Sequence, residues 1–178
     1  MRSRIALLSR MKDVLLGKAE LAKGEQGWTK DTYYRDRGKH RTMCLNGALA
    51  LTEYDLFDVK LDPDVYGGAS PDRDDIACRE ELTREGEDAK RLLAETIVEM
   101  YPGVARRHTE VVTLEDIGSF DAGQVHEVIV DFNDDEQTDQ AAITAVLEKC
   151  ERKAYDRWLE DQQLGRPADG EALIDSIT

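Results

Sequence analysis

The sequence predicts an α+β domain in which four or five helices pack on a small sheet of two to four strands. Several segments place apolar residues at helical spacing, and one segment, Val125–Phe132, is typical of a strand. Helices and strands do not alternate regularly, which argues against a large doubly wound parallel sheet. A chain of 178 residues is long enough to bury a real core as one domain. We therefore expect a globular domain over 1–163 and a polar, flexible tail over 164–178.

The first 50 residues predict a helix, a hairpin and the start of a second helix. Apolar residues recur at helical spacing over Arg4–Lys23. An extended stretch opens at residue 27, and the basic turn Arg35–Arg41 suits the tip of a hairpin. A short helix is expected to begin at Thr42 or Cys44.

The middle of the chain predicts a loop and two helices. Pro63, a glycine pair and several aspartates mark 55–70 as mostly loop. Ser70-Pro71 suits a helix start, with serine as the cap and proline at the first helical position. Gly86 is expected to separate that helix from the next or to kink one long helix. The following helix carries an apolar stripe made of Ala89, Leu92, Leu93, Thr96, Ile97 and Met100.

The last third of the chain predicts strands and a long helix. The segment at 109–113 suits a strand, and Thr113 is alternatively the cap of a short helical turn. Val125–Phe132 places apolar residues on both faces at a period of two, which predicts a central strand. The final helix is expected from Thr138 to Gln163, with a buried stripe made of Ile143, Val146, Leu147, Cys150, Ala154 and Trp158.

The charge of the chain is strongly negative and uneven. The net charge is −14, which divides into +6 over residues 1–50 and −20 over residues 51–178. The acidic part repels free nucleic acid but suits a protein with a basic surface, including one that normally binds nucleic acid. Acidity also keeps a small protein soluble. An acidic insertion at about 55–88 is the expected partner surface, through Asp62, Asp64, Asp72, Asp74 and Asp75.

The sequence favours a reducing cytoplasm. No apolar run approaches the roughly 20 residues of a membrane span, and the run Ile5–Leu8 is too short for a signal peptide. The three cysteines are scattered without a C-x-x-C pair, so we expect no zinc site.

Three short blocks carry a family resemblance. They are Gly27-Trp28-Thr29, then Cys44-Leu45-Asn46-Gly47-Ala48-Leu49, and Phe132-Asn133-Asp134 followed by Thr138. In their order and spacing they resemble an uncharacterised domain family of actinobacteria and their phages, over Ile5–Lys153. Phe132 stands where that family often has tryptophan. The resemblance implies a phage-associated origin, but it supplies no activity, cofactor or catalytic residue.

Cys44 is the candidate catalytic residue. An expected position at a helix N-terminus would stabilise its thiolate. A base from His40, His108 or His126, with an orienting group from Asn133-Asp134, would complete a hydrolase or transferase site. The alternative is structural: cysteine packs as a small apolar residue, and Gly47 allows close helix contact.

Two further patterns suggest a binding site, and each also has a purely structural interpretation. Asp131-x-Asn133-x-Asp135 begins like a calcium loop, but Glu136 and Ala142 replace the glycine and glutamate that such a loop needs, so we expect helix capping and no metal or cofactor. The basic turn is compatible with nucleic-acid binding or with a solvated hairpin tip. Its candidate residues are Arg35, Arg37, Lys39 and Arg41, beside Tyr33 and Tyr34.

The leading hypothesis is a small non-enzymatic interaction protein that presents an acidic surface to another protein. Cysteine-dependent catalysis and nucleic-acid binding are the alternatives. Self-association through the last helix, near Trp158 and Leu159, remains open, and no membrane contact is expected.

Overall fold

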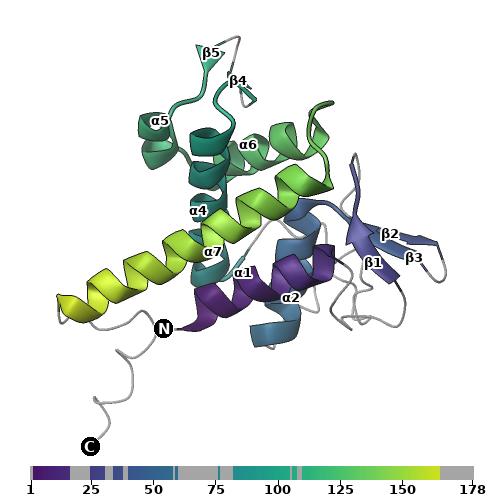
Figure 1. Ribbon diagram of the computed structural model, residues 1–178, viewed down its shortest axis with the longest axis horizontal. Coiled ribbons are helices and arrows are strands. Elements are labelled where there is room, and N and C mark those ends of the chain that lie inside the picture. The colour runs from purple at the N-terminus through teal and green to yellow at the C-terminus, as the bar shows by residue number, and fades with distance from the viewer. Residues whose placement is uncertain are drawn as a thin grey trace, which may run out of the picture.

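The computed structural model describes residues 2–16, 25–30, 34–37, 40–57, 59, 76, 82–104, 106–107 and 110–164 (Figure 1). Helices make up most of this part. Their bounds are α1 Arg2–Leu15, α2 Leu45–Phe57, α4 Arg84–Met100, α5 Leu114–Ser119, α6 Ala122–Asp134 and α7 Gln140–Gln163.

The strands are short and lie at the periphery of the helices (Figure 1). One sheet has the order β1-β3-β2, with β3 parallel to β1 and antiparallel to β2. The other is a two-stranded ladder of β4 and β5. Their bounds are β1 Glu25–Trp28, β2 Tyr34–Arg37, β3 His40–Met43, β4 Arg106–Arg107 and β5 Glu110–Val111.

The α+β class, with helices packed on a sheet, is wrong. The part of the chain that the structure describes is mostly helical, and its helices pack on one another. Among the buried core side chains described, Met43 is the one that comes from a strand. The buried stripes of α1, α2, α4, α6 and α7 supply most of the rest. The three-stranded sheet therefore lies beside a core that is built mainly by the helices.

The segment predicted as the central strand, Val125–Phe132, is helical and lies inside α6. Its buried residues Val125, Val128, Ile129 and Phe132 lie three or four apart, which is the spacing of one helix face. A capping box begins the helix: Gln124 N–H donates to Asp121 Oδ1 at 2.8 Å, and Asp121 N–H donates to Gln124 Oε1 at 3.0 Å. The alternating pattern was compatible with both periods, and the capping box decides between them.

Gly86 neither separates two helices nor kinks one, because it lies in the first turn of α4. A Cβ added there would lie 2.0 Å from Glu53 Oε1. The Glu53 side chain is fully buried and accepts hydrogen bonds from Thr83 N–H at 2.7 Å and Thr83 Oγ1–H at 2.6 Å. Glycine therefore makes room for a carboxylate that ties α2 to the start of α4.

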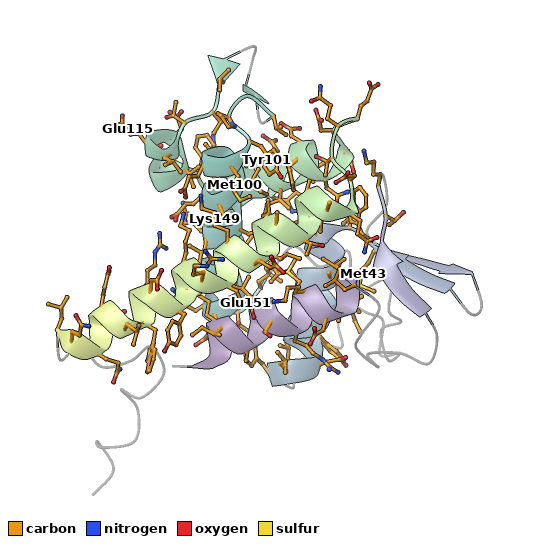
Figure 2. The ribbon with its side chains drawn as sticks, in the orientation of Figure 1. Met43, Met100, Tyr101, Glu115, Lys149 and Glu151 are labelled. Carbon is orange, nitrogen blue, oxygen red and sulfur yellow. The ribbon has the colours of Figure 1, made fainter. Side chains whose placement is uncertain are left out.

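The two longest helices lie against α1 and each other (Figure 1). Gln140 at the start of α7 donates to the carbonyl of Leu15 at the end of α1, at 3.1 Å. Lys12, earlier in α1, pairs with Glu151, later in α7, so the two helices run antiparallel. Figure 2 shows Glu151 on the side of α7 that faces α1. On α4, Glu99 pairs with Lys149 and with Lys153.

Other expectations have mixed outcomes. The hairpin and the Thr113 cap are present: β2 pairs with β3, and Thr113 with Asp116 forms a capping box on α5. The helix predicted over Arg4–Lys23 is described as far as Leu15, and the helix start at Ser70-Pro71 lies outside the described residues. So does the tail from residue 165. None of the described helices combines the length and apolar character needed to cross a bilayer.

Candidate functional site

The three sequence blocks meet at one buried side chain, Asn133 near the end of α6. Its Oδ1 accepts hydrogen bonds from Trp28 Nε1–H at 2.7 Å and from Leu45 N–H at 3.2 Å. Its Nδ2 donates to the Thr29 carbonyl at 3.2 Å and to Asp134 Oδ1 at 2.6 Å. We call Trp28, Thr29, Cys44, Asn133 and Asp134 the motif junction.

Asn133 joins three elements that are far apart in the sequence. Only 2% of its surface is exposed. Its side chain makes hydrogen bonds to the end of β1, the start of α2 and its own neighbour, so both amide groups are fully used. The bond to Leu45 also satisfies one of the free N–H groups at the start of α2. A buried and saturated amide of this kind specifies one arrangement of its partners.

Lys30 closes the junction on its outer side. Its Nζ lies 5.5 Å from the centroid of the Trp28 ring and donates to the Asp135 carbonyl at the end of α6. A cation at a helix C-terminus is favoured by the helix dipole. Thr138, the last member of the third block, is buried, and its N–H donates to the carbonyl of Asp135 at 3.1 Å.

Cys44 is a buried thiol next to an acidic group. Its side chain is 7% exposed, and Sγ accepts a hydrogen bond from Gly47 N–H at 3.3 Å. Burial, with a smaller contribution from the negative charge of Asp134, raises the pKa of Cys44 from 9.0 to about 11, although hydrogen bonds from backbone N–H groups oppose the rise. The thiol is therefore neutral at physiological pH, although it lies at a helix start.

The histidines proposed as bases do not complete a Cys44 site in the described part of the chain. His126 lies on α6, seven residues before Asn133, and the side chains of His40 and His108 are outside the described residues. Among the described residues, the groups that shift the pKa of Cys44 are backbone N–H groups and Asp134. Catalysis by Cys44 stays a prediction that this geometry does not favour.

The remaining residues of the second block are packed in the core. Gly47 is buried, and the side chains of Ala48 and Leu49 are essentially fully buried. They lie in the first turns of α2, which packs on α1 and α6. Their place in the block is thus accounted for by packing.

The acidic turn after α6 shows capping geometry. Asp135 Oδ1 accepts from Gln137 N–H at 2.8 Å, and Asp139 Oδ1 accepts from Ala142 N–H at 2.8 Å, which caps α7. Over the described residues, no group of three or more His, Cys, Asp or Glu side chains is placed to hold a metal ion.

The residues predicted to bind partners cannot be placed at a site. The predicted acidic residues Asp62, Asp64, Asp72, Asp74 and Asp75 lie outside the described residues. So does Lys39 of the basic turn. Arg35, Arg37 and Arg41 fall in strands β2 and β3, where the structure describes the backbone and not their side chains.

A second acidic region was missed in the sequence. Residues 108–148 contain eleven Asp and Glu and no Lys or Arg. Figure 2 places Glu115 on α5, well away from Met43 at the end of strand β3. We call the exposed acidic side chains of this stretch the acidic surface: Glu115, Asp121, Glu127, Asp131, Glu136, Asp139 and Glu148. The absence of basic residues over 41 positions was the available signal.

A family of unknown function, DUF6197, matches residues 6–153. The chain belongs to this family. The motif junction and the acidic surface both lie inside the matched DUF6197 region. Comparison with curated proteins and with solved structures gave no match.

Proposed function

We propose that this DUF6197 member is a small, phage-associated cytoplasmic protein that acts by binding another protein through its acidic surface. The partner presents a basic surface, including one that ordinarily binds nucleic acid. The observation that carries the proposal is the stretch 108–148, which gathers eleven acidic residues without one Lys or Arg. The phage association rests on the three sequence blocks alone.

Part of the acidic surface is not explained by local stability. Glu127 and Asp131 lie four residues apart on α6, where like charges destabilise a helix by roughly 0.2–0.5 kcal/mol. Asp121 and Asp139 are exceptions because each caps a helix, and Glu115 is another because it lies in the first turn of α5, where the helix dipole favours anions. The like charge of Glu127 beside Asp131 supports a role for Glu127 outside folding.

A cluster of acidic side chains without basic neighbours in the sequence suits recognition of a basic surface. They raise the rate of encounter with a positively charged protein and make binding sensitive to salt. They also repel the phosphates of free nucleic acid, so direct nucleic-acid binding is not the function that this part of the chain favours.

The hydrogen bonds of the motif junction support a structural role for its residues, which leaves binding to the acidic surface. The polar atoms of Asn133 are committed to Trp28, Thr29, Leu45 and Asp134 inside the protein. Because these groups are already hydrogen-bonded to one another, they stabilise the fold and are not available to bind a substrate. A hydrolase or transferase using Cys44 would need a thiolate, which burial disfavours there.

The test is capture from a host-like lysate followed by binding with purified components. The tagged protein is incubated at low and moderate salt, and bound proteins are identified by mass spectrometry after nuclease treatment. The affinity for a stoichiometric partner is then compared between two variants. One is Glu115→Gln with Glu127→Gln on the acidic surface; the other is Asp156→Asn with Glu160→Gln, which removes two exposed charges from α7.

We expect a salt-sensitive partner whose affinity falls by about 2- to 30-fold for the first variant, from ~0.2–1 kcal/mol per exposed ion pair. The α7 variant should bind like the parent protein. Equal weakening by both variants would reduce the effect to net charge, and a partner indifferent to both would remove the acidic surface from the interaction.

A further inference from the structure

We draw no further inference here: the strongest candidate, the exposed apolar pair Val111 and Leu114 where the β4–β5 ladder meets α5, borders the acidic surface already proposed, and nothing in the structure shows what covers it.

Discussion

The motif junction and the acidic surface use polar residues in opposite ways. At the junction, Asn133 is almost fully buried, and each of its polar atoms has a partner within 3.2 Å. On the acidic surface, Glu115 and Glu127 project into solvent from α5 and α6. Buried polar groups are costly unless they are satisfied, whereas exposed charges contribute little to stability. We infer that the junction specifies the fold and that the acidic surface is available for recognition.

The largest expected effect is at the centre of the junction. Asn133→Ala would leave the indole N–H of Trp28 and the N–H of Leu45 without their acceptor. At about 1–3 kcal/mol for each of these two buried unsatisfied groups, we expect a loss of roughly 2–6 kcal/mol in the free energy of unfolding. Urea denaturation followed by circular dichroism measures it.

Gln137→Ala is the control for that experiment, since Gln137 is exposed in the turn that follows α6. It should change stability by less than about 0.5 kcal/mol. A loss at Asn133 no larger than at Gln137 would show that the junction does not hold the fold.

The next effect concerns the reactivity of Cys44, the buried thiol of the motif junction. Because burial raises the pKa of Cys44 from 9.0 to about 11, its thiolate fraction near pH 8 should fall roughly 100-fold below that of the unfolded chain. Iodoacetamide labelling of Cys44, followed by peptide mass spectrometry in native buffer and in urea, measures the two rates. Native labelling as fast as labelling in urea would return Cys44 to the candidate nucleophiles.

Gly86 extends the comparison to a second buried polar contact. Gly86→Ala places a Cβ against the Glu53 carboxylate, and we expect a loss of about 1–3 kcal/mol in stability. Gly118→Ala is the matched control, because a Cβ there meets nothing within 4 Å inside α5. That control should gain about 0.5–1 kcal/mol. Thermal unfolding of both variants checks the signs, and a neutral Gly86→Ala would contradict the close approach.

The smallest effect belongs to the acidic surface. Glu127→Gln relieves the like-charge pair with Asp131, so stability should rise by roughly 0.2–0.5 kcal/mol at low salt. The gain should shrink as salt screens the pair. Urea denaturation at two salt concentrations measures it, and a clear loss would assign Glu127 a structural role.

The sequence predicts individual helices better than their assembly. The stripe from Ala89 to Ile97 is the buried face of α4, as its spacing indicated. The strand predicted at Val125–Phe132 was wrong because its apolar residues fit both a strand buried on its two faces and one face of a helix. The signal that separates the two is short: Asp121 followed three residues later by Gln124, a capping box.

The motif junction could be anticipated only in part. Three short blocks in a fixed order indicate that Trp28, Cys44 and Asn133 matter together, but the bond from Trp28 to Asn133 spans 105 residues. Spacing within a block does not determine contacts over such a distance, because they depend on how the helices pack. The acidic surface, by contrast, could be predicted from the sequence alone, because 108–148 has no Lys or Arg. The segment around 55–88 was chosen instead, since its aspartates cluster more closely, although it also contains four Lys and Arg.

The most direct test of the account crosses the two regions. Unfolding free energy and affinity for the captured partner are measured for Trp28→Phe at the junction and for Glu115→Gln with Glu127→Gln on the acidic surface. We expect Trp28→Phe to lose about 1 kcal/mol of stability through the missing hydrogen bond to Asn133, yet to bind normally while folded. The surface variant should keep its stability and lose affinity. The reverse pattern, with binding lost at the junction and stability lost at the surface, would contradict the division of roles.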